Sequence, residues 1–127
     1  MTMRLLLDTH IFLWLAAGSP QLNSHARTLI AGANSVYVSS VTIWESAIKT
    51  RIGKLTVDPD DLLLEIEKCC FQELPVLGRH VAGVARLPLL HADPFDRLLV
   101  AQAVTETLHL MTADAQLAAY SDLVLVI

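Results

Sequence analysis

The chain has 127 residues, which is enough for one domain with a sizeable core and too few for two. Its hydrophobic fraction of 54% and charged fraction of 17% exclude a disordered protein and favour elements that are buried on both faces. The net charge of −4 gives no overall attraction to nucleic acid or to a membrane surface, so a polyanionic partner would have to be bound locally. Its two cysteines, Cys69 and Cys70, are adjacent, which excludes a disulfide framework and suggests a reducing, cytoplasmic location.

The first twenty residues have the outline of a secretory signal peptide, with an early basic residue, apolar stretches and small residues at the end. Asp8 and His10 interrupt this pattern. No apolar run approaches the ~18 residues that a membrane span needs. We therefore expect the N-terminus to be part of the fold, and no association with a membrane.

Short apolar runs and helical patterns alternate along the chain. The expected strands are residues 3–7, 36–39, 72–76, 108–111 and 123–127. The expected helices are residues 10–17, 24–31, 41–52, 58–71, 79–87, 95–107 and 114–120, with stops at Gly18, Gly32, Gly53 and Pro88. Nearly continuous apolar strands separated by helices predict an α/β fold with a parallel sheet covered on both faces.

Acidic residues lie near the strand ends where a parallel sheet builds its binding sites. Asp8 comes directly after the first strand and Asp114 shortly after the fourth. Glu45 lies in the first turns of the helix after the second strand, and Asp96 lies beside Asp93 at the start of the helix before the fourth. Convergent carboxylates repel one another, and a hard divalent cation such as Mg²⁺ or Mn²⁺ relieves that repulsion.

Each acid also has a purely structural explanation. Asp8, Asp93 and Asp114 precede predicted helices and are good N-caps, and Asp96 favours the positive end of the same helix as Asp93. Glu45 completes a capping-box pattern with the threonine three residues before it. For any single acid the sequence leaves both explanations open, and the metal-site hypothesis depends on the set as a whole.

Other polar residues show no competing catalytic pattern. The five histidines lack the HExxH motif and any paired spacing, which is evidence against a zinc site, although His91 lies two residues before Asp93 and is placed to orient a ligand. No nucleophile elbow and no glycine-rich phosphate loop is present. Lys49, Arg51 and Lys54 form either a solvated helix end or a local patch that attracts phosphate.

Four segments resemble the signature segments of PIN-domain ribonucleases, specifically the VapC-like toxins of bacterial type II toxin–antitoxin modules. They are LLLDTHIFLW, VSSVTIWESAIK, LLHADPFDRLLVAQA and LMTADAQL, in the order and spacing of the family. By position, the resemblance assigns metal-site acids to Asp8, Glu45, Asp96 and Asp114. It assigns supporting roles to Thr9, His91, Asp93 and Thr112.

The resemblance implies a single PIN domain over residues 1–127, folded as a three-layer sandwich whose parallel five-stranded sheet has the order 3-2-1-4-5. It also implies a homodimer, an RNA substrate, a cognate antitoxin and dependence on one or two Mg²⁺ or Mn²⁺ ions. The expected reaction is hydrolysis of single-stranded or loop RNA by metal-activated water, which leaves a 5′-phosphate and a 3′-hydroxyl. Asp8, Asp96 and Asp114 would hold the first ion, and Glu45 would orient the water or help to hold a second.

Two other functions compete with this hypothesis. A noncatalytic interaction module of the same fold would use the acids only as caps, which the full set of four disfavours. A phosphoacceptor receiver domain would need paired acids after the first strand and a lysine near the last. Asp8 is instead followed by Thr9 and His10, and the C-terminal LVLVI contains no lysine.

Overall fold

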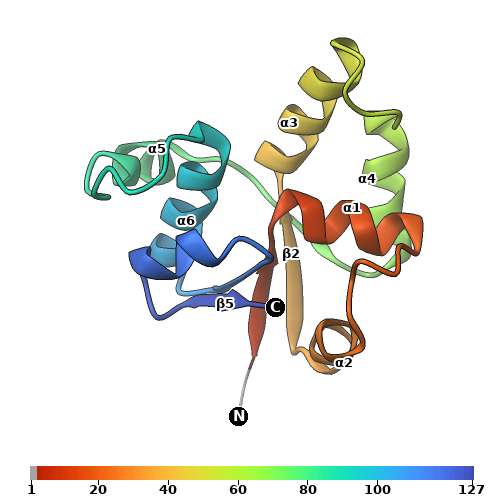
Figure 1. Ribbon diagram of the computed structural model, residues 1–127, viewed down its shortest axis with the longest axis horizontal. Coiled ribbons are helices and arrows are strands. Elements are labelled where there is room, and N and C mark those ends of the chain that lie inside the picture. Colours follow the sequence, from red (N-terminus) through yellow and green to blue (C-terminus); the bar gives the residue numbers. More distant parts are fainter. Residues whose placement is uncertain (1–2) are drawn as a thin grey trace.

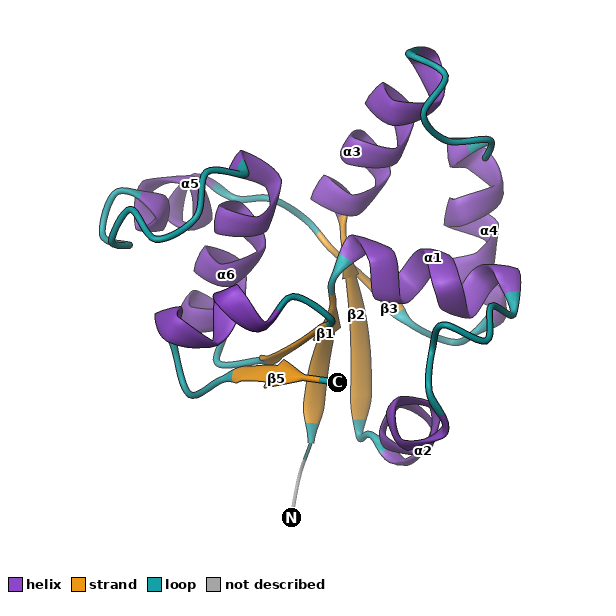
Figure 2. Cartoon of the chain, viewed as in Figure 1, coloured by secondary structure: helices purple, strands orange, loops and turns teal. Residues whose placement is uncertain are grey.

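A computed structural model of the chain describes residues 3–127. One parallel sheet has the order β3-β2-β1-β4-β5, which confirms the predicted fold class and strand order. The strands are β1 (Arg4–Leu7), β2 (Ser35–Ser39), β3 (Gln72–Leu74), β4 (His109–Thr112) and β5 (Val124–Val126) (Figure 2). The helices are α1 (Thr9–Ala17), α2 (Ser24–Gly32), α3 (Ser40–Arg51), α4 (Pro59–Lys68), α5 (Gly78–Val84), α6 (Pro94–Glu106) and the 3-10 helix η1 (Ala115–Tyr120).

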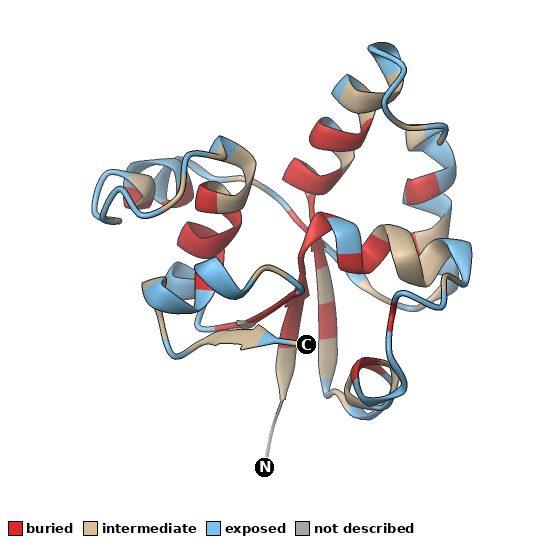
Figure 3. Cartoon of the chain, in the orientation of Figure 1, coloured by how far each residue is buried: buried red, intermediate tan, exposed pale blue. Residues whose placement is uncertain are grey.

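The central strand β1 belongs to both halves of the core, because successive side chains of a strand point to opposite faces of the sheet. Leu5 and Leu7 pack with apolar residues of α1, α2 and α4, whereas Leu6 packs with residues of α6 and η1. Figure 1 shows α1, α2 and α4 on one side of β1, and α5 and α6 on the other. Buried residues concentrate in the central strands and on the inner sides of the helices (Figure 3).

Helix ends agree with the sequence at two of the three predicted glycine stops, whereas Gly32 is the last residue of α2 and Ala33 is its C-cap. Gly18 and Gly53 take left-handed φ values of 63° and 80° after α1 and α3, as predicted. The helix predicted for residues 58–71 ends at Lys68, because Cys70 takes a φ of 58° and its N–H returns to the carbonyl of Glu67. Likewise α6 ends at Glu106, because Thr107 has a φ of 55°.

The helix predicted for residues 79–87 also ends early. After Val84, the N–H groups of residues 85–87 bond to carbonyls three residues back, so the last turn tightens. Pro88 follows, and the residue before a proline avoids helical backbone angles. No helix within residues 3–127 has the length and apolar character needed to cross a membrane.

Helix α3 follows β2 without a loop, and this connection places Glu45. Ser39 is both the last residue of β2 and the N-cap of α3, where its hydroxyl accepts a hydrogen bond from Val41 N–H at 3.0 Å. Glu45 therefore lies in the second turn of α3, where its side chain is buried. Helix α3 contacts α1, α4 and α6, so Glu45 is held near the start of the helices that carry the other acids.

Candidate metal centre

The acids that follow β1 and β4 are joined through one threonine. The two strands run in parallel with Leu7 opposite Met111, and Asp8 N–H continues the pairing by donating to the Met111 carbonyl at 2.9 Å. Thr112 Oγ1 donates to Asp8 Oδ2 at 2.6 Å and accepts from Asp114 N–H at 3.0 Å. Thr112 therefore fixes the positions of Asp8 and Asp114 relative to each other.

Helix α6 brings a third acid to the same place. Asp93 caps the helix, because its Oδ1 accepts from two backbone N–H groups of the first turn at 2.8 and 3.3 Å. Asp96 follows in that turn, and Asp8, Asp96 and Asp114 line one open hollow of about 280 Å³. His10 of α1 lines another part of the same wall.

Glu45 is buried beside this hollow rather than in its wall. Only 2% of the residue is exposed, and its Oε2 accepts a hydrogen bond from Lys49 Nζ at 2.6 Å. Burial is the main cause of the raised pKa values of Asp8 and Asp96, and the negative charge of Glu45 contributes to both. Glu45 therefore belongs to the same electrostatic cluster as the acids that line the hollow.

His91 is a hydrogen-bond donor to this cluster. Its Nδ1 accepts from Asp93 N–H at 3.1 Å, so a neutral ring carries its proton on Nε2. That Nε2–H lies 2.9 Å from Asp114 Oδ2 and 3.8 Å from Asp96 Oδ2. One potential ligand atom each of His91, Asp96 and Asp114 lies within 4.8 Å of the others. In this arrangement both ring nitrogens of His91 are engaged in hydrogen bonds, so neither has a free lone pair for an ion.

Two carboxylate oxygens of the centre are buried without a partner. Among the described residues, Asp8 Oδ1 and Glu45 Oε1 have no hydrogen-bond donor. A buried charged oxygen without a partner is costly, and a cation is the partner that a set of carboxylates accepts best. The residues therefore fit a hard divalent ion such as Mg²⁺ or Mn²⁺.

Burial and mutual repulsion disfavour the charged form of two acids. Burial raises the pKa of Asp8 against the opposing effect of the Thr112 hydrogen bond. Burial, followed by the charges of Asp8, Asp93 and Glu45, raises the pKa of Asp96 to about 7. Without metal, the folded chain thus resists full ionisation of the cluster at neutral pH.

The capping explanation holds for some acids and fails for others. Asp93 caps α6, and Asp114 caps η1 by accepting from Gln116 N–H at 3.0 Å. Asp8 occupies the N-cap position of α1 but makes no capping hydrogen bond through its side chain. Glu45 is in no capping box, because Ser39 caps α3 and Glu45 lies one turn further along.

The remaining supporting residues differ in how closely they approach the acids. The Thr9 hydroxyl bonds to that of Thr42 at 3.0 Å, so it ties the start of α1 to α3. Lys49, expected at a solvated helix end or in a phosphate-attracting patch, is paired with Glu45 in the structure. Their spacing of four residues on one helix was the available signal.

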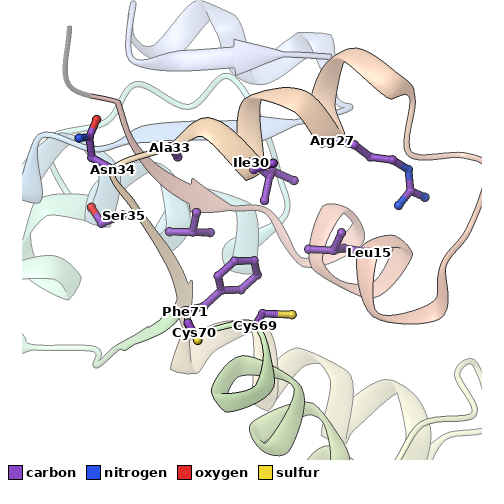
Figure 4. Close-up of a pocket in the computed structure, with 11 residues that line it drawn as sticks. Leu15, Arg27, Ile30, Ala33, Asn34, Ser35, Cys69, Cys70 and Phe71 are labelled. Atoms are coloured by element: carbon purple, nitrogen blue, oxygen red, sulfur yellow. The ribbon is translucent and has the colours of Figure 1, made fainter.

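A second hollow lies near the start of β2, between α1, α2 and the end of α4 (Figure 4). Its lining includes Leu15, Ile30, Phe71 and both cysteines, and no acidic residue. The acids lie at the other ends of the strands, after β1 and β4. This hollow is therefore separate from the candidate metal centre.

The model of the PIN domain family matches residues 5–123. The chain belongs to the PIN domain family. No curated protein sequence matches it. The PIN fold of the chain is similar to that of VapBC2 from Rickettsia felis, solved with a DNA fragment from its promoter, at a TM-score of 0.71 and 16% identity over 96% of each chain.

Two further solved structures share this PIN fold. A toxin–antitoxin complex from Klebsiella pneumoniae has a TM-score of 0.64 at 18% identity, over 90% of this chain and 89% of that chain. FitAcB from Neisseria gonorrhoeae has a TM-score of 0.62 at 20% identity, over 89% of each chain. At these identities the similarity is one of fold.

The raised pKa of Asp96 predicts a pH-dependent stability of the metal-free protein. Because the pKa of Asp96 is higher in the folded state than in the unfolded state, the folded protein loses stability as the pH rises from 3.8, the ordinary pKa, to about 7. Above that pH the loss stays constant. Asp96→Asn should therefore raise the melting temperature at pH 8 in chelator. The gain is at most about 4 kcal/mol, at about 1.4 kcal/mol per pKa unit, and should vanish near pH 4.

Asp61→Asn is a matched control for this measurement. Asp61 follows Asp58 and Pro59 at the start of α4 as Asp96 follows Asp93 and Pro94, but it is exposed. Asp61→Asn should lower the free energy of unfolding by no more than ~1 kcal/mol, the contribution of a charge at a helix N-terminus, whereas Asp96→Asn should raise it. Parallel pH profiles for the two variants would contradict the repulsion argument.

Proposed function

We propose that this chain is a divalent-metal-dependent endoribonuclease that cleaves single-stranded or loop RNA and acts as the toxin of a toxin–antitoxin pair. The observation that carries the proposal is the convergence of Asp8, Glu45, Asp96 and Asp114 from four separate segments, with two buried oxygens left without a donor. Caps alone do not require such a cluster, because a cap is satisfied on its own helix.

In the proposed reaction, Asp8, Asp96 and Asp114 would hold the metal. The bound ion would supply an activated water and positive charge for the phosphate. Thr112 keeps Asp8 and Asp114 in register, and His91 donates to Asp114. Glu45 keeps one oxygen without a protein donor, available to accept a hydrogen bond from the attacking water.

The shape of the hollow supports a single-stranded substrate. It is open, and the aromatic ring of Trp14 lies in its wall with the imidazole of His10 6.1 Å away, centroid to centroid. Aromatic rings beside a phosphate-binding centre can stack on unpaired bases, which a duplex does not offer. The excess of negative charge means that the metal must supply the main attraction for phosphate.

The toxin role is supported by the structural neighbours, which include VapBC2 and a complex described as toxin–antitoxin. We further propose a single domain, a cytoplasmic location, and a homodimer. The dimer is supported by exposed apolar side chains on α3 and α5, among them Trp44, Ile48 and Val81.

The purified protein should cleave single-stranded RNA with Mg²⁺ or Mn²⁺ and be inactive in chelator. Asp8→Asn should lose at least ~10²-fold in activity, because it removes a charged ligand. Asp93→Asn is the control and should lose much less, since asparagine caps a helix about as well as aspartate. Cleavage that survives both chelation and the Asp8 change would exclude the proposed metal chemistry and favour a noncatalytic module with a contaminating nuclease.

Expression of the chain alone in a bacterial host should arrest growth, and the Asp8→Asn variant should not. The arrest should be relieved by a partner that covers the acid cluster, for example an apolar helix that carries an arginine into it. Growth and the level of soluble protein are measured together. Normal growth with abundant, active protein would refute the toxin role and leave the nuclease chemistry standing.

The hydrogen bond from His91 to Asp114 can be tested by a pair of variants. A glutamine amide places its N–H near the position of Nε2 and retains the donor, whereas an asparagine amide reaches only as far as Nδ1. His91→Asn should weaken Mn²⁺ binding by about 10- to 100-fold, the usual effect of losing a partner of a metal ligand. His91→Gln should stay near the wild-type affinity in calorimetric titration. Equal losses in both variants would contradict the orienting role.

A further inference from the structure

The proposed reaction assigns no role to Lys49, the lysine that is paired with Glu45 of the candidate metal centre. Its ammonium lies 2.6 Å from Glu45 Oε2, one helical turn further along α3. The pair is not an ordinary surface ion pair, because the glutamate side chain is only 3% exposed. Within residues 3–127, Lys49 is the only lysine or arginine that is ion-paired with any of the four acids.

The ammonium lies in the field of Glu45, Asp93 and Asp96. The hydrogen bond to Glu45, and then the charges of Glu45, Asp93 and Asp96, raise the pKa of Lys49, so the side chain stays charged over the range in which proteins fold. A lysine is a compact point charge that can neutralise a carboxylate without a fixed coordination geometry. Lys49 therefore neutralises the negative charge of Glu45, as a bound metal ion would neutralise the charges of the other acids.

The hydrogen bonds divide the centre into two sides. Asp8 and Asp114 are joined by Thr112, and Asp96 shares the hollow with them. Glu45 is buried outside that lining, with one oxygen on the ammonium. A second divalent ion, ~3.5–4 Å from the first as in two-metal sites, would need the carboxylate that Lys49 already neutralises.

We propose that Lys49 takes the place of a second divalent ion, so that the centre binds one metal ion tightly at Asp8, Asp96 and Asp114 while Glu45 is neutralised from within the chain. This inference rests on the proposed metal-dependent function and specifies its stoichiometry. One divalent ion and one ammonium neutralise three of the four carboxylates, and the charge of Lys49 opposes a second ion at Glu45 although Glu45 Oε1 has no protein donor among the described residues.

The test is a calorimetric titration of metal-free protein with Mn²⁺, which counts ions without any use of activity. The wild type should bind one ion tightly. Lys49→Met should bind a second ion at least ~10-fold more tightly than the wild type does, because a unit positive charge has been removed from its site. Lys49→Arg should remain at one ion. Lys54→Met is the control, since Lys54 is exposed beyond the same helix, and it should match the wild type.

Glu45→Gln guards against a folding failure of Lys49→Met, because it removes the buried charge itself and keeps the side-chain shape. It should still bind one ion, more weakly than the wild type because the Lys49 charge is left uncompensated, whereas the double variant Glu45→Gln with Lys49→Met keeps the net charge of the pair and should bind one ion with near wild-type affinity. Two tight ions in the wild type, or the loss of the single ion in Glu45→Gln, would overturn the proposal for Lys49. An absence of any Mn²⁺ binding by the wild type would instead remove the proposed nuclease function.

Discussion

The parallel pairing of β1 with β4 is the contact on which the acidic cluster of the candidate metal centre depends. Parallel neighbours end at the same edge of a sheet, so residues far apart in sequence meet without a dedicated loop. Asp8 extends this pairing by one backbone hydrogen bond to Met111, and Thr112 turns the next position into a bridge between two acids. The sheet itself therefore sets the spacing of Asp8 and Asp114, and helices α3 and α6 position Glu45 and Asp96.

The second constraint is the cost of burying negative charge, and the structure meets it one acid at a time. Thr112 donates to Asp8, His91 to Asp114, and Lys49 to Glu45. Within the part of the chain that the structure describes, the only cationic partner of Asp96 is the imidazole of His91, 3.8 Å away, and Asp96 is the acid whose pKa rises to about 7. The donors thus stabilise the charged form of three carboxylates, whereas the charged form of Asp96 would be stabilised most by a bound cation.

The sequence was sufficient for the elements and for the placement of the acids, because both depend on local pattern. Apolar runs marked the five strands, and glycine marked the ends of α1 and α3. The ends at Cys70 and Thr107 were not predictable, because these residues take the left-handed backbone conformation that non-glycine side chains disfavour, and no glycine marks either position. The family resemblance selected the acids, but the direction of the His91 and Lys49 hydrogen bonds depends on side-chain conformations that only the folded chain fixes.

The bond between Thr112 and Asp8 spans 104 positions of the chain, which has a consequence for the protein during its own synthesis. A growing chain emerges N-terminus first, and β1 alone presents Asp8 without its bridge, without Asp96 and without Asp114. The two cores that share β1 are also incomplete until α6 and β4 have left the ribosome. A centre of this design therefore stays incomplete until the segment through Asp114 has left the ribosome, because the acids of α6 and of the β4 end are then in place for the first time.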